Sequence, residues 1–333
     1  MMRMPAESAP HERTVMCWPA RPTLYGPLLP DAEAAHALVA RTIAAYEPVT
    51  MIANPGVSAD AAAQACGDAV EVVELPIDDS WFRDSGPIYV TDGDRRIALD
   101  WMFNAWGGKF DPHEDDAAVA RRYAALAGDE ARTIPVVLEG GAIAVDGAGT
   151  LVTTEQCLLH PNRNPLLSRA EIEAVLEAEL GVTTIVWLPY GLALDDDTDG
   201  HVDNIAAFAG LGRLLMQGCD DESEDDWLRC NVNIRCARGA IDALGEAIEV
   251  VEVPVLPYAD IGGERVAVPY LNFYVANGLV VVPVCGHPAD DAMLAIIAEH
   301  YPEREVIGLD VGAVLAYGGG GIHCITQQVP RVV

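Results

Sequence analysis

The chain has 333 residues, of which 51% are hydrophobic, and this is enough for a well-buried core in one large or two smaller domains. Lysine and arginine number 20 against 51 aspartates and glutamates, and the net charge of −31 argues against nucleic acid as a partner, because phosphate binding needs a basic patch. No apolar run approaches the roughly 20 residues of a membrane span, so a membrane protein is not expected either.

The N-terminal residues and the cysteines indicate where the protein works. Residues 1–10 lack the basic start and apolar stretch of a secretory signal, so we expect a cytoplasmic protein. The eight cysteines stand singly, without the Cys-x-x-Cys spacing of a zinc ribbon or a redox motif, and are expected to be free thiols in a reducing compartment. The negative charge attracts cations, although solubility alone also explains it.

Predicted helices and strands alternate along the whole chain. The proline-rich residues 1–30 are expected to be irregular, and Asp31 is expected to cap the first helix. Apolar periodicity predicts helices over residues 32–46, 58–65, 111–127, 168–180, 227–244 and 289–299. Short apolar or alternating runs predict strands at 49–53, 70–75, 96–101, 136–138, 142–145, 151–153, 183–188, 205–208, 213–217, 248–253, 272–276, 279–284, 305–309 and 323–325.

Cap and turn signals add detail to this order. Ser168 and Glu171 form the capping-box pattern at the start of one helix. The segment 210–212 and the pair Asn277-Gly278 predict two β-hairpins. Units of strands and a helix recur about five times, as ββαβ-like modules of roughly 60–70 residues. No linker divides them, so we predict one continuous α/β domain over residues 1–333.

Four loops outside these elements concentrate polar residues. They hold, in chain order, Trp81 and Asp84 in segment 81–87, Glu139 before a glycine pair, the acidic run 195–199 ahead of His201 and Asp203, and Cys324 after four consecutive glycines. In a strand, His201 and Asp203 would share one face. The glycine run suits a mobile loop that presents the Cys324 thiol to a ligand.

Together these residue types suit an attack on a planar guanidinium cation. Paired carboxylates, Asp84 and Asp203, would hold its N–H donors. Cys324 would supply a thiolate that reacts near neutral pH. His201 would carry protons to the departing ammonia and from the incoming water, and Trp81 would offer a cation–π face.

Each of these residues also has an ordinary structural interpretation. A glycine run before Cys324 describes a surface turn and a buried cysteine equally well. An aspartate in a turn is usually a cap, and His201 with Asp203 is often a hydrogen-bonded pair. That pair could also bind a metal, but no further histidine or cysteine lies at ligand spacing, so no metal site is predicted.

The chain also resembles the agmatine deiminases, which belong to the bacterial-type peptidyl-arginine deiminase family of the guanidino-group-modifying superfamily. The segments that carry the resemblance cover nearly the whole chain in the family's order: 81–87, 104–108, 138–141, 154–159, 162–165, 200–204, 270–274 and 318–328. The resemblance implies a five-bladed α/β propeller (a pentein) of ββαβ-type modules, with the site on its pseudo-fivefold axis.

The resemblance further implies roles for individual residues. The implied catalytic set is Cys324 as nucleophile, His201 as general acid and base, Asp84 and Asp203 as guanidinium clamps, and Glu139 as the group that orients the histidine. The implied substrate-binding set is Trp81 in the channel wall, Asp197 at the substrate's amine, and Gly321. Asp199 and Gly321 both stand where the family pattern has asparagine.

The implied reaction is the hydrolysis of agmatine to N-carbamoylputrescine and ammonia, a step of putrescine and polyamine metabolism, through a covalent thiouronium on Cys324 and without a cofactor. The expected partner is a small cationic guanidino substrate, and formation of a homo-oligomer stays open. Alternatives are a deiminase of another guanidine or of peptidyl-arginine, an amidinotransferase, and a non-catalytic binding protein. A substrate with a carboxylate would need an arginine in the pocket, for which Arg83 and Arg163 are the candidates.

Overall fold

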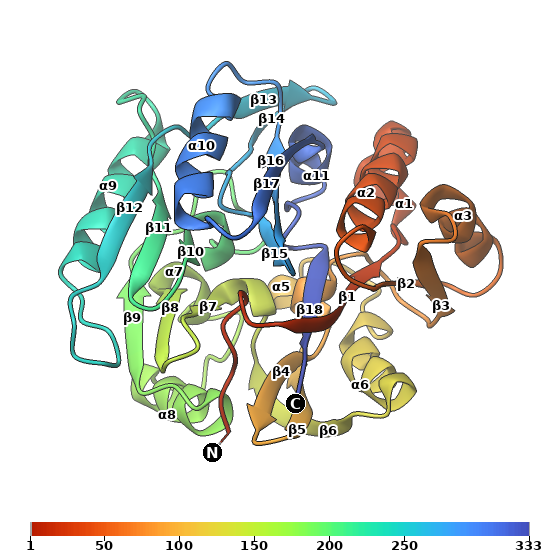
Figure 1. Ribbon diagram of the computed structural model, residues 1–333, viewed down its shortest axis with the longest axis horizontal. Helices are drawn as coiled ribbons and strands as arrows, with labels where there is room; N and C mark the ends of the chain where they lie inside the picture. The colour runs from red at the N-terminus through yellow and green to blue at the C-terminus, as the bar shows by residue number, and fades with distance from the viewer. Residues whose placement is uncertain (1, 333) are drawn as a thin grey trace.

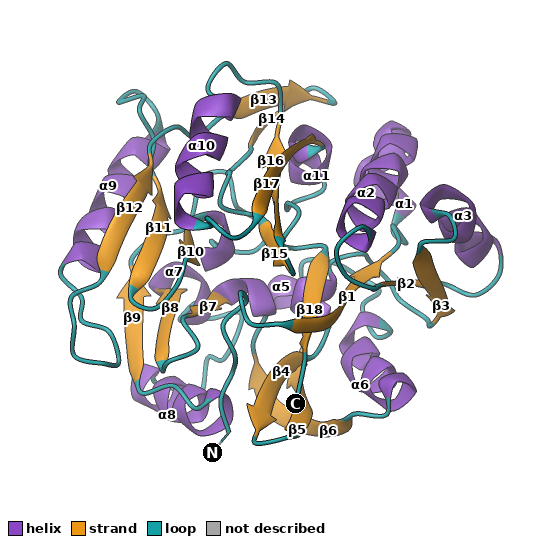
Figure 2. Cartoon of the chain, viewed as in Figure 1, coloured by secondary structure: helices purple, strands orange, loops and turns teal. Residues whose placement is uncertain are grey.

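The computed structural model describes residues 2–332, and within them the strands form five sheets of three or four strands and one separate hairpin (Figures 1 and 2). The sheets, in pairing order, are β18 (Thr326–Pro330), β1 (His11–Cys17), β2 (Val49–Ala53) and β3 (Val70–Glu74); β4 (Ile88–Asp92), β5 (Arg95–Met102) and β6 (Glu130–Val137); β7 (Ile143–Val145), β8 (Thr150–Thr154) and β9 (Thr184–Leu188); β10 (Ala206–Phe208), β11 (Arg213–Gln217) and β12 (Glu249–Val253); and β15 (Tyr274–Ala276), β16 (Leu279–Val284) and β17 (Glu305–Asp310). The hairpin is β13 (Tyr258–Ile261) with β14 (Glu264–Ala267).

The five sheets repeat one pairing pattern. The first two strands of each sheet are antiparallel, and the next pair is parallel. A parallel pair needs a crossover connection, and each crossover here contains a helix. This is the ββαβ order that the sequence predicts, and the last strand, β18, pairs with the first, β1.

The helices fall into long crossover helices and short turns near the sheet edges. The longer ones are α2 (Leu29–Ala44), α3 (Val57–Cys66), α6 (Asp116–Ala127), α8 (Arg169–Leu180), α9 (Asp225–Arg238) and α10 (Asp290–His300). The shorter ones are α1 (Pro22–Tyr25), α4 (Phe82–Ser85), α5 (Ala105–Gly108), α7 (Glu155–Leu158) and α11 (Gly312–Tyr317), with 3-10 helices η1 (Gly26–Leu28), η2 (Gly140–Ala142) and η3 (Val202–Asn204).

The clearest local signals are confirmed. Helix α8 begins directly after Ser168, whose side chain accepts from the Glu171 backbone N–H while the Glu171 carboxylate accepts from the Ser168 N–H, a complete capping box. The pair Asn277-Gly278 joins β15 to β16, and the segment 210–212 lies in the connection between β10 and β11. These signals succeed because both partners of each interaction lie within a few residues.

The prediction for residues 1–30 is wrong. Instead of an irregular segment, the structure has strand β1 and the short helix α1 there. Strand β1 lies between β18 and β2, and its partner β18 comes from the far end of the chain. The two partners lie more than 300 residues apart, so no local pattern announces the strand.

The start of the first long helix and the last strand are also corrected. Helix α2 begins at Leu29, with a proline among its first positions, so Asp31 lies in the first turn and not at the cap. Residues 323–325 form a turn, and strand β18 starts at Thr326. Strand β4 and the hairpin of β13 and β14 are not among the predicted elements.

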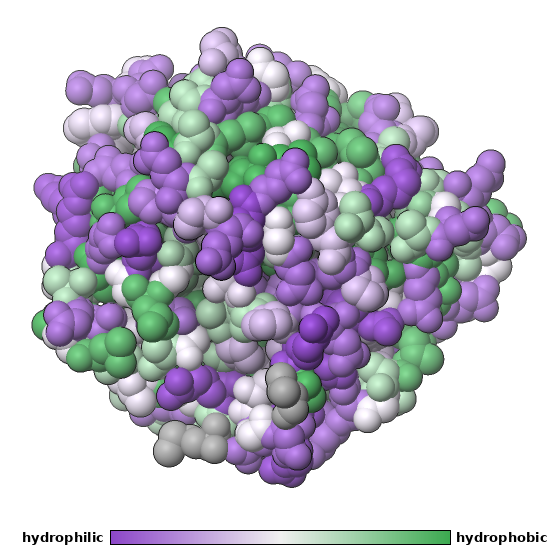
Figure 3. Space-filling view, in the orientation of Figure 1, coloured by the Kyte–Doolittle hydropathy of each residue, from purple (hydrophilic) through white to green (hydrophobic). Residues whose placement is uncertain are grey.

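The core and the surface differ clearly in composition. One buried cluster joins side chains of β1, β2, β16 and α2 with Trp81, Trp106 and Cys324, so the predicted nucleophile borders a dry interior. The visible face in Figure 3 is mostly hydrophilic, with hydrophobic side chains in scattered patches. Each helix among residues 2–332 is too short or too polar to cross a membrane.

Candidate active site

Five segments converge on one place, and each comes from a different sheet. Every segment lies directly ahead of the first strand of its sheet: Asp84 before β4, Glu139 before β7, His201 and Asp203 before β10, Asn272 before β15, and Cys324 before β18. Contacts between α4, η2, η3 and β18 hold these segments together. The repeated fold thus brings together side chains that are up to 240 residues apart in the sequence.

The Cys324 thiol is buried and held among polar groups. Its Sγ lies 3.2 Å from Nδ2 of Asn272 and 3.4 Å from Oδ2 of Asp203. The backbone N–H of Arg83 donates to the Cys324 carbonyl, and the Arg83 guanidinium donates to the carbonyl of His323. Burial raises the pKa of the Cys324 thiol well above its usual value, and the carboxylates of Asp203 and Asp84 raise it further.

Two carboxylates face the same space as the thiol. Asp84 accepts at Oδ1 from the Gly141 N–H and at Oδ2 from Nε1 of Trp106, each at 2.9 Å. Burial raises the pKa of Asp84. Asp203 uses Oδ2 for Nδ1 of His323 at 2.9 Å, and its Oδ1 is buried without a hydrogen-bond partner among residues 2–332. Burial alone would raise the pKa of Asp203, but the hydrogen bond and charge of His323 lower it.

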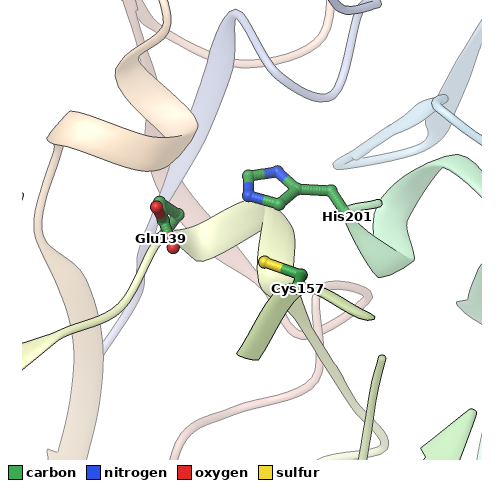
Figure 4. Close-up of side chains that lie close together, drawn as sticks. All are labelled: Glu139, Cys157 and His201. Carbon is green, nitrogen blue, oxygen red and sulfur yellow. The ribbon is translucent and has the colours of Figure 1, made fainter. Parts of the chain in front are cut away.

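His201 is fully buried, and its ring lies between acidic groups. Its Nδ1 lies 3.8 Å from Oδ2 of Asp84, and neither ring nitrogen has a hydrogen-bond partner within residues 2–332. Figure 4 shows the edge of the ring facing Glu139, with the Cys157 thiol beside them. Burial alone would lower the pKa of His201, but Asp84, the Cys157 sulfur and Asp203 together outweigh it, and the pKa lies well above its usual value.

Glu139 is fully buried and fixed from behind by Arg163. The Arg163 Nε lies 2.6 Å from Oε1 of Glu139, while Oε2 has no hydrogen-bond partner in the described part of the chain. The donor atoms of Glu139, Cys157 and His201 all lie within 4.8 Å of one another, so the structure assembles a set of metal-type ligands that the sequence spacing does not reveal. The Arg163 cation opposes a second cation there.

Two glycines leave room for the side chains of the site to lie close to the backbone. A Cβ on Gly141 would lie 2.5 Å from Nδ1 of His201 and 2.9 Å from carboxylate oxygens of both Asp84 and Asp203. A Cβ on Gly320 would lie 2.6 Å from the Trp81 ring. These two positions are therefore restricted to glycine by space around the reacting groups.

Gly321 is explained by a neighbouring side chain. A Cβ at this position would collide with Oδ1 of Asn272, which accepts from the His323 backbone N–H at 3.0 Å. The Gly321 backbone also lowers the pKa of the Cys324 thiol, against the larger effects of burial and the two carboxylates. Gly321 lies beside the thiol but lines neither of the two hollows described next.

One hollow, the front passage, reaches the thiol, and a second, larger hollow, the mouth, meets it at Asp197. The front passage, of about 10 Å³, is lined by Trp81, Asp84, Trp106, Phe110, Asp197, Thr198, Gly318, Gly319 and Cys324. The mouth, of about 140 Å³, is lined by residues of the 192–197 loop, β14 and the segment 316–320. Asp197 belongs to both, and burial raises the pKa of its carboxyl, with Asp195 adding to the rise.

The acidic run is ordered by specific bonds. Asp195 accepts from the backbone N–H groups of Thr198 and His201 and from Nδ2 of Asn204. Asp196, by contrast, is exposed. His201 and Asp203 are not on a strand: His201 precedes η3 and Asp203 lies inside it, so the prediction of a shared strand face is wrong.

For several residues of the site, the sequence predicts no role or a different one. Trp106 and Asn272 lie in segments that carry the family resemblance, yet their bonds to Asp84 and Cys324 appear only in the structure. Arg163 was a candidate for a substrate carboxylate, but it is committed to Glu139 and to Asp199, 2.6 Å from each. Arg83 lies 3.5 Å from Glu7 and is likewise committed.

The arrangement favours a small planar cation. Three buried carboxylates surround a space with unpaired acceptor oxygens on Glu139 and Asp203, and Arg163 pairs with Glu139 from one side. A ligand with several N–H donors satisfies those oxygens, and its charge lowers the cost of burying them. The thiol lies at the same place, where it can attack the ligand.

The chain is similar to known deiminases over nearly its whole length. The family model for the Porphyromonas-type peptidyl-arginine deiminases matches residues 3–330. Agmatine deiminases of Pseudomonas aeruginosa and Stutzerimonas stutzeri are 43% and 42% identical, and each match covers 98% of this chain and 95% of the relative. A solved structure of the agmatine deiminase of Enterococcus faecalis superimposes with a TM-score of 0.95 at 30% identity, covering 100% of this chain and 96% of that one.

Proposed function

The chain belongs to the Porphyromonas-type peptidyl-arginine deiminase family, and we propose that it hydrolyses agmatine to N-carbamoylputrescine and ammonia. Relatives that match over 95% of their own length carry the name of this activity. The observation that supports the proposal most strongly is the set of buried, partly unpaired carboxylates around Cys324. The substrate is a small dication, with a guanidinium at one end and an ammonium at the other.

Binding places the guanidinium between Asp84 and Asp203. The free Oδ1 of Asp203 and the outer lone pairs of Asp84 accept its N–H donors, while Trp106 and His323 keep both carboxylates oriented. The positive charge also changes the thiol. In the free enzyme the pKa of Cys324 is raised, and a bound cation beside the sulfur lowers it again, so the thiolate forms when substrate is present.

The first step is attack of the Cys324 sulfur on the guanidinium carbon. A C–S bond forms, and one terminal C–N bond then breaks. The leaving nitrogen takes a proton from His201. Burial would lower the pKa of this histidine, but Asp84, the Cys157 sulfur and Asp203 together raise it, and the raised pKa favours the protonated ring. The product of this step is ammonia and a thiouronium cation, still held by the carboxylates.

The second step is hydrolysis of the thiouronium. Water gives one proton to the neutral His201 as its oxygen bonds to the carbon, and the C–S bond then breaks to return the thiolate. The second proton passes to solvent, from which the released ammonia takes a proton to become ammonium. Arg163 fixes the Glu139 carboxylate, whose charge, within 4.8 Å of the imidazole, stabilises the protonated ring during this step.

The tail of the substrate lies along the front passage. Trp81 lines its wall, and Asp197 lies where the passage meets the mouth, so its carboxylate meets the ammonium. A substrate carboxylate is disfavoured, because Arg83 and Arg163 are both buried in other ion pairs. This favours agmatine over arginine or peptidyl-arginine.

The proposal extends to the whole molecule. We take the five repeated sheets as the blades of a five-bladed α/β propeller, because the site segments occupy equivalent positions ahead of each first strand. Residues 1–333 would act as one catalytic domain. The eight cysteines are free thiols, which fits a cytoplasmic enzyme of small-molecule metabolism.

A panel of guanidines tests the proposal. Ammonia release should be fastest with agmatine, weaker with guanidines that lack the terminal ammonium, and weakest with arginine. Dialysis against EDTA should leave the rate unchanged, because no step uses a metal. Faster release with arginine or an arginine peptide would point to the alternative deiminase, and amidine transfer to an added amine in place of hydrolysis would point to the amidinotransferase.

A further inference from the structure

The proposed reaction requires ammonia and water to exchange at the site between its two steps. After the thiouronium forms, ammonia must leave and water must enter while the four-carbon tail is still attached to Cys324. The tail then occupies the front passage, the narrow hollow that Trp81, Asp197 and Cys324 line. Exchange by this route would have to wait for the tail to move, although the tail is bound covalently at one end and ionically at the other.

A second cavity reaches the site by a different route. Strands β7 and β10 form its walls together with Leu271 and Phe273, and its polar groups are Asp203, His323 and Glu7. Its volume of about 20 Å³ is sufficient for one water molecule. It shares no lining residue with the front passage.

The polar end of this second cavity borders the reacting groups. His323 bridges two carboxylates, with Nδ1 2.9 Å from Asp203 and Nε2 2.8 Å from Glu7. The same Asp203 oxygen lies 3.4 Å from the Cys324 sulfur. The cavity therefore borders the reaction centre at the Asp203 carboxylate and the His323 ring.

The outer end lies under the N-terminal segment. This segment passes beside β7 on its way to β1, as Figure 1 shows in red, and a Cβ on Gly147, just after β7, would lie 2.6 Å from the backbone of Ala6. Glu7, on the same segment, has a side chain 20% exposed, so it joins the cavity to solvent. Its pKa is lowered to about 2, because the charges of His323 and Arg83 outweigh burial, and its negative charge attracts ammonium.

We propose that this second cavity is the passage through which ammonia leaves and the hydrolytic water enters while the substrate tail occupies the front passage. The inference rests on the proposed function. In chemical terms, ammonia freed by C–N cleavage leaves toward Glu7 and takes a proton from solvent there. Water arriving by the same route forms the C–O bond on the face of the thiouronium beside Asp203, and the C–S bond then breaks.

A size change in the wall tests the passage. Ala144 of β7 and Ala207 of β10 are both partly buried and line the cavity. Ala144→Leu narrows it, and Ala144→Ser is the matched control of nearly the original size. With agmatine, the leucine variant should lose kcat severalfold with a lower KM, and acid-quenched intact mass should show more enzyme carrying the thiouronium. The serine variant should behave like the wild type.

Other outcomes decide against the passage. Unchanged kcat in a folded Ala144→Leu variant, or a loss of kcat without accumulated adduct, would overturn it, and Ala207→Leu repeats the test from the opposite wall. If neither leucine variant folds by circular dichroism, Phe208→Ala widens the same cavity. Added hydroxylamine should then capture a larger share of the thiouronium as the N-hydroxyguanidine than in the wild type, and an unchanged share overturns the proposal. A wild type that releases no ammonia from any guanidine would instead overturn the proposed function.

Discussion

The inner carboxylate site and the acidic loop at the mouth use the same residue type in opposite ways. Asp84, Asp203 and Glu139 are at most 5% exposed, and each is oriented by a partner from another segment. In the loop 195–199, the carboxylates are half-buried or exposed, and most of their partners lie within the loop or come from Lys109 and Arg163. Charge at the inner site is desolvated, whereas charge at the mouth stays in contact with water.

This difference separates chemistry from recognition. A desolvated carboxylate interacts strongly with a cation, because the surroundings screen it little. A hydrated carboxylate contributes less, because water competes for the ligand. Substitutions at the inner site should therefore cost far more activity than substitutions at the mouth.

The largest effect is expected for Asp203→Asn. The amide oxygen can still accept from His323, so the fold should persist while the charge that holds the guanidinium is lost. Removing one partner of a buried ion pair costs about 3–5 kcal/mol, so kcat/KM for agmatine should fall by about 10²–10⁴-fold. Asp196→Asn, on the exposed neighbouring loop, is the charge-matched control. Equal losses of kcat/KM in the two variants would contradict the proposed difference between the inner site and the mouth.

The pH profile should also separate free and occupied inner sites. Burial and the two carboxylates raise the pKa of the Cys324 thiol, so the rising limb of kcat/KM should lie at alkaline pH. The raised pKa of His201 moves the falling limb toward alkali as well, so the whole bell should be displaced to higher pH. Because the bound cation lowers the thiol pKa, the rising limb of kcat should lie at lower pH than that of kcat/KM. Coincident limbs in steady-state assays would contradict thiolate formation on binding.

A moderate effect is expected for Asp197→Asn at the end of the passage. A charge-assisted hydrogen bond contributes about 1.5–3 kcal/mol, so KM for agmatine should rise by about 10–100-fold with a smaller change in kcat. A guanidine whose tail ends in a methyl group should be almost unaffected. If both substrates lose equally, Asp197 supports the catalytic loop and does not meet the ammonium.

The smallest effect is expected for Lys109→Met. Its ammonium lies 2.7 Å from Asp199 and also donates to the carbonyls of Asp196 and Asp197, which orients the loop. Because the side chain is 28% exposed, the loss should be about 0.5–1.5 kcal/mol, or a two- to tenfold rise in KM. Lys109→Arg should restore most of it. A larger loss than for Asp197→Asn would reverse the expected order.

The same contrast explains what the sequence could predict. Cys324, His201, Asp84, Asp203 and Glu139 belong to segments with a distinctive family pattern, and the structure brings all of them to one place. The sequence also predicts the helix cap at Ser168, because its partner is three residues away.

Interactions between distant parts of the chain could not be predicted from local sequence patterns. Strand β1 depends on β18, and the orientation of Glu139 depends on Arg163, two segments further along the chain. Asp195 looks like any residue of an acidic run until the turn of the loop directs it to the His201 N–H. In each case the decisive partner is set by tertiary packing and leaves no mark on the local sequence.

The central claim is that Cys324 forms the thiouronium, and peptide mass mapping of an acid-quenched reaction with agmatine tests it most directly. The wild type should carry the mass of agmatine less ammonia on the peptide that contains Cys324, because this sulfur alone among the described cysteines contacts Asp203 and Asn272. Cys157→Ser, the control for the second buried thiol of the site, should retain that adduct. Cys324→Ser should carry none and release almost no ammonia. An adduct on Cys157, or substantial ammonia release by Cys324→Ser, would contradict the account.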